Sequence, residues 1–357
     1  MIRIGLTDHI EGPRDRPSAE IFAEVGELVE IADRLGVAHA WFTEHHAHAH
    51  HGHLPTPLLF ASHLLGRTRR IELGTAVICL NLHHPLDVAE QTVVADLLSG
   101  GRLAPGFGSG STPEEFTLFG VDVTAEAERH ARFEEALHLI LSAWRGSIEE
   151  PSTAFRLPAH RPLPIAATDL PARTWLAVNS EGSAAIAGRL GFNMLFSHLR
   201  TPEQYRRYRE VYLEAGGNGA IAANRPVFVG VDDESAFREA EPALRTLWRR
   251  FRAEGKIAAD TREPEDPRNL TGHPINFIVG GPDSVARAFL DLHEQIPYDV
   301  MNVEVRWANL DHEQVLASLE RLMRNVVPML PTGRCGRGAT STDSASRGLA
   351  RCESPVA

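Results

Sequence analysis

Short runs of apolar residues alternate with longer amphipathic segments along most of the chain. The first run, residues 2–6, precedes a segment over residues 18–35 in which apolar positions recur every three or four residues and which stops at Gly36. Continuous apolar runs predict buried parallel strands, and the 3.6-residue period predicts helices. The predicted strands are residues 2–6, 38–42, 71–80, 103–107, 174–178, 193–197, 226–231 and 300–305. This order predicts an α/β fold, a (β/α)8 TIM barrel with a parallel eight-stranded sheet and insertions.

Two segments interrupt the alternation. Residues 234–273 contain a helix-like run at 240–251, followed by glycine, aspartate, proline and charged residues. Because long insertions in compact domains are usually functional or disordered, this one is either a lid over the strand ends or a surface excursion. Residues 332–357 are rich in Gly, Ser, Thr and Arg, which predicts disorder. We expect a single barrel domain over residues 1–331 and a disordered tail over residues 332–357.

Composition narrows the class of protein. The 357 residues are 43% hydrophobic, as in folded globular proteins, and the net charge of -11 argues against nucleic acid as a partner. The first residues do not resemble a secretion signal, and apolar runs fall short of membrane-spanning length, so we expect a cytoplasmic protein with no membrane partner. Cys79, Cys335 and Cys352 form neither a disulfide framework nor a metal-binding spacing.

Polar and small residues follow several of the predicted strands. In a barrel of this kind, catalytic residues come from the carboxyl ends of the strands, so these residues are expected to face one cavity. They are Glu44, His45 and His46, then residues 74–77, residues 106–110, residues 179–183, and Ser197 with His198.

The turn at residues 179–183 is the clearest candidate for binding an anion. A helix that starts at Ser180 presents backbone N–H groups and a favourable dipole, and the hydroxyls of Ser180 and Ser183 add donors. The alternative is that Asn179 or Ser180 is only a helix N-cap. The glycines of residues 106–110 permit close approach of a ligand and favour the phosphate interpretation. Neither turn matches a P-loop or a dinucleotide-binding fingerprint.

Histidines are concentrated after the second predicted strand. His45 and His46 are adjacent, so on an extended segment they point in opposite directions and do not chelate one ion together. The following loop adds His48, His50, His51 and His53. Its composition suggests metal binding, but it lacks a carboxylate or cysteine at ligand spacing, and a polar rim explains it equally well. We therefore expect no metal site.

Seven motifs occur in the order found in one enzyme family. They are Trp-Phe-Thr-Glu-His-His at 41–46, Leu-Pro-Thr-Pro-Leu at 54–58, Arg-Arg-Ile-Glu-Leu-Gly-Thr-Ala-Val at 69–77, His-Pro-Leu-Asp-Val-Ala-Glu at 84–90, Leu-Ser-Gly-Gly-Arg-Leu at 98–103, Asn-Ser at 179–180 and Phe-Ile-Val-Gly-Gly-Pro at 277–282. Together they resemble the bacterial-luciferase-like flavin-dependent monooxygenase family over residues 2–330. As a series they are specific, although each motif alone is weak.

The resemblance implies a barrel that binds reduced FMN at its strand ends, usually as a homodimer. It implies that His45 is the catalytic histidine and that the Ala76–Val77 peptide bond is cis and lies under the flavin ring. The cofactor-binding residues that it implies are Glu44, Thr75, Ala76, Val77, Gly108, Ser109, Asn179, Ser180, Ser183 and Ser197. Among these, residues 179, 180 and 183 would hold the phosphate, and residue 197 would lie near the ring.

Two positions depart from the luciferase subunit. Gly108-Ser109 stands where that subunit has Cys-Arg, which removes a charged partner for the phosphate. Asn179 replaces an acidic residue, which lessens repulsion towards a phosphate and offsets part of that loss.

The resemblance implies an oxidoreductase that uses reduced FMN and O2 to oxygenate a small organic substrate through a C4a-peroxyflavin. A flavin reductase would supply the reduced FMN, as a diffusing co-substrate, and His45 would relay a proton, since histidine titrates near neutral pH. Three alternatives stay open: deazaflavin-dependent hydride transfer on the same barrel, a non-catalytic flavin-binding protein, and, last, a metal hydrolase built on the histidine-rich loop.

Overall fold

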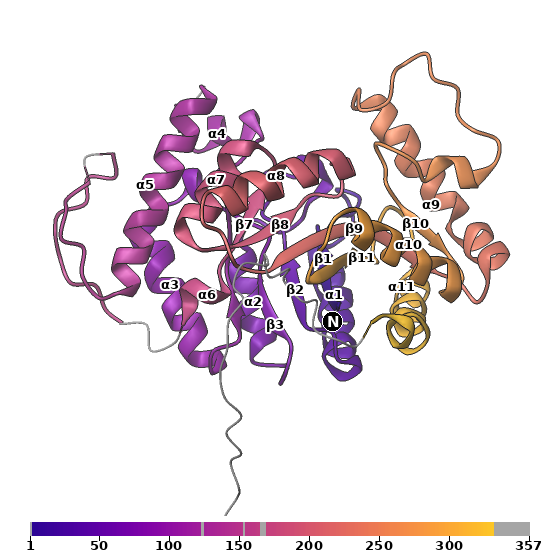
Figure 1. Ribbon diagram of the computed structural model, residues 1–357, viewed down its shortest axis with the longest axis horizontal. Helices are drawn as coiled ribbons and strands as arrows, with labels where there is room; N and C mark the ends of the chain where they lie inside the picture. Colours follow the sequence, from indigo (N-terminus) through magenta and orange to yellow (C-terminus); the bar gives the residue numbers. More distant parts are fainter. Residues whose placement is uncertain (1, 123–124, 153, 165–168, 332–357) are drawn as a thin grey trace, which may run out of the picture.

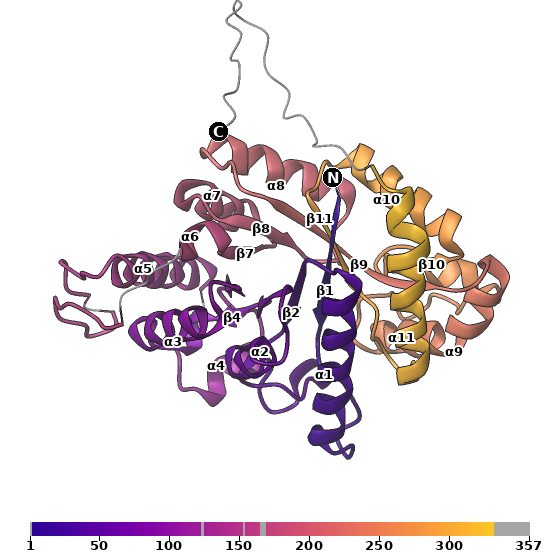
Figure 2. The same ribbon diagram turned by 90° about the horizontal axis from the view of Figure 1, so that it is seen from below.

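Parallel strands occupy the centre of the molecule, and helices surround them (Figures 1 and 2). The computed structural model describes residues 2–122, 125–152, 154–164 and 169–331. The strands are β1 (Arg3–Asp8), β2 (His39–Phe42), β3 (Glu72–Thr75), β4 (Ile78–Cys79), β5 (Leu103–Ala104), β6 (Gly106–Gly108), β7 (Trp175–Val178), β8 (Asn193–Phe196), β9 (Ile221–Val229), β10 (Ile278–Gly280) and β11 (Val300–Glu304). Among the described residues, every ladder between these strands is parallel.

The helices alternate with the strands, as the hydrophobic pattern predicts. They are α1 (Ser18–Leu35), α2 (Pro57–Leu65), α3 (Pro85–Ser99), α4 (Pro113–Leu118), α5 (Glu126–Trp144), α6 (Leu170–Arg173), α7 (Glu181–Leu190), α8 (Pro202–Glu214), α9 (Asp233–Ala253), α10 (Pro282–Gln295) and α11 (His312–Arg321). Short helical turns lie at Ala49–His51, Leu80–Leu82, Pro267–Leu270, Leu322–Val326 and Val327–Met329. Helix α1 shows how the sequence pattern produces a helix. Its residues Ile21, Val25 and Leu28 lie on one buried face, and Gly36 ends the helix with a left-handed φ of 86°.

The strand order is β4-β6-β7-β8-β9-β11-β1-β2-β3-β5, and β10 pairs with β9. Two of the predicted strands are each divided in two, because 71–80 contains β3 and β4 and 103–107 contains β5 and β6. Pro105 has no N–H for a ladder, and the Thr75 hydroxyl bridges the gap by donating to Gly106 O at 2.8 Å and accepting from Gly106 N at 3.0 Å. The prediction of a parallel, barrel-like α/β fold is confirmed. The count of eight strands is not, since the sheet contains 11 strands within the described ranges.

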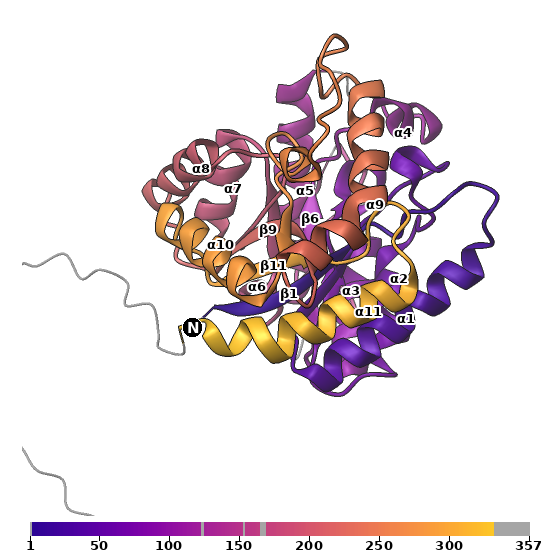
Figure 3. The ribbon, with the colours of Figure 1, turned by 90° about the vertical axis from the view of Figure 1, so that its right-hand side faces the viewer.

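The segment predicted as an insertion carries its own apolar cluster. Helix α9 includes the predicted run 240–251, and its Leu244 and Trp248 pack in a cluster with Phe277 and Trp307. Figures 1 and 3 show α9 and the loop after it beside β10, at one end of the barrel. Arg250 of α9 forms an ion pair with Glu11 at 2.7 Å, which ties the segment to the residues that follow β1.

Two further expectations concern the C-terminal tail and membrane-spanning segments. The tail predicted to be disordered, residues 332–357, lies outside the described residues. In the described part of the chain, none of the helices combines the length and apolarity required to cross a membrane.

Candidate active site

The carboxyl ends of the parallel strands bring histidines and carboxylates from distant parts of the sequence together. His45 follows β2, and its ring stacks on that of His9, which follows β1, with a centroid distance of 6.4 Å and an interplanar angle of 21°. His198 follows β8, and its ring meets His9 edge-on, also at 6.4 Å. We call this end of the barrel the mouth.

His45, the predicted catalytic residue, lies in the mouth with 18% of its side chain exposed. Its Nδ1 atom is 3.6 Å from Glu115 Oε1, which also accepts the backbone N–H of His46 at 2.8 Å. Burial raises the pKa of Glu115, but His45 and the backbone N–H outweigh burial and hold it below its ordinary value. Glu115 lies on α4, so this short helix fixes the carboxylate that faces the catalytic candidate.

Glu44 lies under the mouth surface, with only 1% of its side chain exposed. Oε1 accepts hydrogen bonds from His46 Nε2 at 3.0 Å and His83 Nε2 at 2.9 Å, and Oε2 accepts from Cys79 N at 3.1 Å. Burial raises the pKa of Glu44, but these donors outweigh it and lower the pKa; in turn the carboxylate raises the pKa of His83 against the effect of burial. His45 and His46 therefore contact different carboxylates, as expected for adjacent side chains.

The break between β3 and β4 exposes backbone to the mouth. The Ala76–Val77 peptide bond is cis, as predicted, and both residues are partly exposed. A Cβ atom on Gly108 would lie 2.5 Å from Val77 Cγ2, so the absence of a side chain at residue 108 permits this close approach. Ser109 follows and is partly exposed, whereas Thr75 is fully buried and its hydroxyl is used by Gly106.

The turn between β7 and α7 is an N-terminal capping box. Ser180 Oγ accepts from Ser183 N at 3.2 Å, and Ser183 Oγ accepts from Asn179 N at 3.2 Å and from Ser180 N at 3.1 Å. Asn179 is exposed, Ser180 is partly exposed and Ser183 is buried. The N-cap interpretation is thus confirmed, while phosphate binding by this turn stays a prediction.

A histidine that we did not predict lies beside this turn. His130 belongs to α5, and a Cβ atom on Gly182 would lie 3.3 Å from its Nδ1 atom. The imidazole ring therefore lies against the first turn of α7. Only the packing of α5 on α7 brings these residues together, so no local sequence signal indicates the contact.

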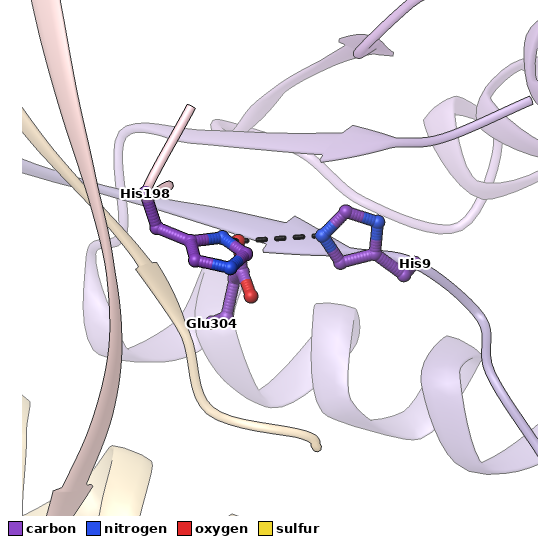
Figure 4. A group of neighbouring side chains, drawn as sticks. All are labelled: His9, His198 and Glu304. Carbon is purple, nitrogen blue, oxygen red and sulfur yellow. Dashed lines mark hydrogen bonds and ion pairs between the residues drawn. The ribbon is translucent and has the colours of Figure 1, made fainter. Parts of the chain in front are cut away.

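A second group surrounds Glu304 at the end of β11, and His198 is the one member that we predicted to face the cavity. Figure 4 shows the imidazole rings of His9 and His198 next to its carboxylate, and Oε1 lies 3.3 Å from His9 Nε2 and 3.0 Å from His198 Nδ1. Asn224 Nδ2 donates to the same oxygen at 2.8 Å. Burial lowers the pKa of His9, but Glu304 outweighs burial and raises it to about 9; the pKa of Glu304 itself is lowered by the two histidines, again against burial.

The sequence contained an indication of this group, namely the positions of two of its residues at the ends of predicted strands. His9 and Glu304 stand at the carboxyl ends of the first and last predicted strands, where the barrel rule places functional residues. Ser197, the predicted ring neighbour, precedes His198, and its Oγ accepts from Leu199 N at 3.3 Å.

The histidine-rich loop forms hydrogen bonds at the rim of the mouth. His48 Nε2 and His53 Nε2 contact Gly12 O at 3.0 and 3.2 Å, and His50 Nε2 contacts Thr112 Oγ1 at 3.2 Å. These contacts support the polar-rim interpretation. Among the described residues, the groups of three side chains with atoms close enough to share a metal ion are His9, His198 and Glu304, and Glu44, His46 and His83.

Known proteins resemble this chain over most of its length. It is 30% identical over 333 residues to the uncharacterized protein y4wF of Sinorhizobium fredii, covering 87% of this chain and 92% of that protein. It is 23% identical to the oxygenase component of the flavin-dependent trigonelline monooxygenase of Acinetobacter baylyi, covering 94% and 98%. An F420-dependent glucose-6-phosphate dehydrogenase of Amycolatopsis mediterranei is 30% identical over 149 residues, covering 40% and 42%.

A solved structure shares the fold. The oxygenating constituent of 3,6-diketocamphane monooxygenase from Pseudomonas putida, a type II Baeyer-Villiger monooxygenase in complex with FMN, superposes with a TM-score of 0.74 at 21% identity, covering 92% of this chain and 98% of that one. The sequence profile described as luciferase-like monooxygenase matches residues 2–298. The trigonelline enzyme is named flavin-dependent and the dehydrogenase F420-dependent, and several relatives are named monooxygenases. This chain is an oxidoreductase and belongs to the luciferase-like monooxygenase family.

Proposed function

We propose that this protein is a monooxygenase that uses reduced FMN and O2 to oxygenate a small organic substrate in the mouth. The observation that carries the proposal is that one mouth contains the features that the flavin enzyme needs. His45, with Glu115 facing its Nδ1 atom, and the partly exposed residues Ala76 and Val77 all lie at strand ends in a chain of the luciferase-like family. When bound, reduced FMN supplies the reaction with O2, while the protein binds, orients and handles protons.

The phosphate end of FMN would bind at the start of α7. The N-terminus of a helix presents unpaired N–H groups and a positive dipole end, and Asn179 and Ser180 are accessible there. His130 lies against Gly182 and adds a basic group near this turn. It partly replaces the arginine that Gly108-Ser109 lacks. Ser183 contributes indirectly, because its hydroxyl holds the N–H groups of residues 179 and 180 in the cap.

The ring of FMN would lie over the break in the sheet. Ala76 and Val77 would present backbone there, Gly108 makes room for the Val77 side chain, and Ser109 and Ser197 would line the approach. The buried residues support this surface through hydrogen bonds. Thr75 links β3 to Gly106, and Glu44 holds the rings of His46 and His83 in place. These contacts fix the surface on which a planar ring would rest.

His45 would move the proton during oxygenation. Its ring is partly exposed, and Glu115 faces its Nδ1 atom, so the carboxylate would orient the ring. A histidine held in this way can donate a proton at Nε2 and recover it from water. The proton is therefore delivered inside the mouth, where α9 and the segment 234–273 would exclude bulk water as a lid.

The same proposal implies a partner protein, an oligomeric state and a location in the cell. The trigonelline enzyme is named as an oxygenase component, so we expect a separate flavin reductase to deliver reduced FMN to this chain. We further propose a cytoplasmic homodimer in which residues 1–331 form one domain.

Oxygen uptake tests the proposal. The purified chain is mixed anaerobically with photoreduced FMN and then with buffer containing O2 and a panel of ketones, aldehydes and aromatic compounds. We expect a product that incorporates one atom from 18O2, in amounts that follow the reduced FMN supplied. If no compound gives a labelled product although FMN binds, the chain is not a monooxygenase for these classes.

Hydride transfer from reduced F420 is the second candidate, because a relative in the comparison is an F420-dependent dehydrogenase. The same panel is run anaerobically with reduced F420. Substrate reduction without O2, together with no labelled product with reduced FMN, would favour this candidate.

A further inference from the structure

Three side chains from three different strand ends meet at one point of the mouth. His9 follows β1, His198 follows β8 and Glu304 ends β11, and Figure 4 shows that both rings are turned towards the carboxylate. Both ring nitrogens approach the same oxygen, Glu304 Oε1, at 3.3 and 3.0 Å. The residues come from separate strands of the barrel, so the backbone holds the arrangement rigidly.

The distances match the spacing of ligands around a metal ion. Nitrogen and oxygen ligands about 2.1 Å from Zn²⁺ are about 3.0 Å apart at right angles and about 3.4 Å apart in a tetrahedron. The two nitrogen-to-oxygen distances in this group fall in that range. Two imidazoles and one carboxylate are also the ligand types that divalent first-row transition metals accept, whereas Mg²⁺ and Ca²⁺ prefer oxygen.

Two buried atoms at this point of the mouth form no hydrogen bond. Within the described part of the chain, they are His9 Nε2, which has only an ion-pair distance of 3.3 Å to Glu304 Oε1, and Oδ1 of the adjacent Asn224. A buried polar atom without a partner is costly, and coordination or approach to a cation would satisfy it. The side chain of His9 is 31% exposed overall, so an ion can reach the group from the mouth.

The other histidine and carboxylate group has similar distances, but among the described residues none of its buried side-chain atoms lacks a hydrogen bond. Both oxygens of Glu44 accept hydrogen bonds, from His46, His83 and Cys79 N, so the carboxylate is already satisfied. We infer that His9, His198 and Glu304 form a binding site for a divalent transition-metal ion, with three protein ligands and the remaining positions open to water or to a substrate oxygen. The inference rests on this geometry and is independent of the flavin chemistry proposed above.

Cobalt binding tests the inference, because Co²⁺ occupies zinc-type sites and its visible spectrum reports nitrogen ligands. The full chain is prepared without a histidine tag, stripped with a chelator and titrated with Co²⁺ at about pH 8, where coordination releases any proton that the imidazoles hold. We expect one Co²⁺ per chain, displaced by Zn²⁺, and a rise in thermal unfolding temperature with the ion. Glu304→Gln and His198→Gln should each weaken binding by more than about tenfold.

Matched variants distinguish this site from others. Glu72→Gln breaks another buried histidine pair, His39 with Glu72 at 3.2 Å, at the amino ends of β2 and β3, and should leave binding unchanged. His83→Gln removes a member of the Glu44 group and should also leave it unchanged. If either 304 or 198 variant fails to fold, His9→Gln provides the same test.

Two results would overturn the inference. One is the absence of stoichiometric Co²⁺ binding by the wild-type chain; the other is binding that survives in Glu304→Gln and His198→Gln but is lost in His83→Gln. Because the readout is metal occupancy, failure to find monooxygenase turnover leaves this test unaffected.

Discussion

The two sides of the mouth use their polar groups differently. At the start of α7, Ser180 and Ser183 are hydrogen-bonded to each other and to the adjacent backbone. On the opposite run of strand ends, β11, β1 and β2, His9, Glu304 and His45 are charged or titratable, and His9 Nε2 is buried without a hydrogen bond. A turn whose hydroxyls are already hydrogen-bonded has a fixed geometry, which suits it to bind an unreactive part of a ligand, such as a phosphate. A set of titratable groups that can still form hydrogen bonds is suited to transfer protons or to bind an ion.

Removing the titratable ring of His45 should have the largest effect. We expect His45→Ala to lower product formation per reduced FMN by about 10²- to 10⁴-fold, the usual contribution of a general acid or base. FMN affinity should change little, because in the proposed binding mode the phosphate end would lie on the other side of the mouth. Single-turnover product yield and FMN titration measure the two quantities.

His51→Ala is the control for that variant, because His51 lies exposed on the histidine-rich loop. It should retain the product yield of the wild type. Full yield from His45→Ala would show that its ring does not handle the proton and would break the division of the mouth into a binding side and a chemical side.

The Glu44 group should govern stability in a defined pH range. The folded pKa of Glu44 is lowered, so its contribution is present above the ordinary value of 4.5 and is lost as pH falls through the folded pKa. The folded pKa of His83 is raised, so its contribution is full below 6.5 and is lost as pH rises through the folded pKa. The pair therefore stabilises the fold most between these two values.

We expect His83→Gln to lower the free energy of unfolding by about 1.5–3 kcal/mol near pH 5.5, as for a hydrogen bond to a charged group. The difference from the wild type should shrink at alkaline pH, as the pH rises through the raised folded pKa of His83 and the ring loses its proton. Urea unfolding at both pH values measures it. A difference that is independent of pH would mean that packing, and not the charge of His83, is responsible.

The fold was predictable because its hydrophobic pattern is strictly local. Continuous apolar runs such as 193–197 and 300–305 correspond to β8 and β11. The division of 71–80 was not predictable in the same way, because Thr75 completes the gap with a hydrogen bond to Gly106, 31 residues away. Strand β10 was missed, since its three residues are too few to show a period.

The site was predictable only where motif and strand end coincide. His45 lies in such a motif, and the structure places it in the mouth. Glu304 was missed although it ends a predicted strand, because nothing near it in sequence indicates His9 or His198, 295 and 106 residues away. His130 lies on a helix with ordinary amphipathic spacing, and only tertiary packing brings it to Gly182.

The carboxylate that faces His45 should have a smaller effect than the ring itself. Glu115→Gln keeps an oxygen that can accept the N–H of His46 but removes the charge 3.6 Å from His45 Nδ1. We expect turnover to fall about tenfold, equal to about 1.4 kcal/mol in the barrier. The pH dependence of turnover should change on its acid side, because residue 115, whose pKa His45 and the N–H of His46 hold below its ordinary value in the wild type, no longer titrates.

Glu114→Gln is the matched control, because Glu114 is the neighbouring residue of α4 and is exposed. It should leave both turnover and its pH profile unchanged. Equal slowing in the two variants, with no shift in the pH profile, would assign the effect to the stability of α4 and not to the charge near His45.

Replacing the basic group at the start of α7 should have the smallest effect. His130→Ala should weaken FMN about three- to fivefold, which is less than about 1 kcal/mol, because His130 is one contributor beside the helix dipole and the backbone N–H groups. Riboflavin lacks the phosphate, so its affinity should not change. Fluorescence titration with both flavins measures the difference directly.

Ser180→Ala separates the two roles of the turn. Loss of the cap should lower the free energy of unfolding by about 1 kcal/mol, whereas His130→Ala should leave stability nearly unchanged. If His130→Ala lowers the affinity for FMN and for riboflavin equally, the start of α7 does not bind the phosphate. The binding side of the mouth would then lie elsewhere, and the turn would serve only to begin the helix.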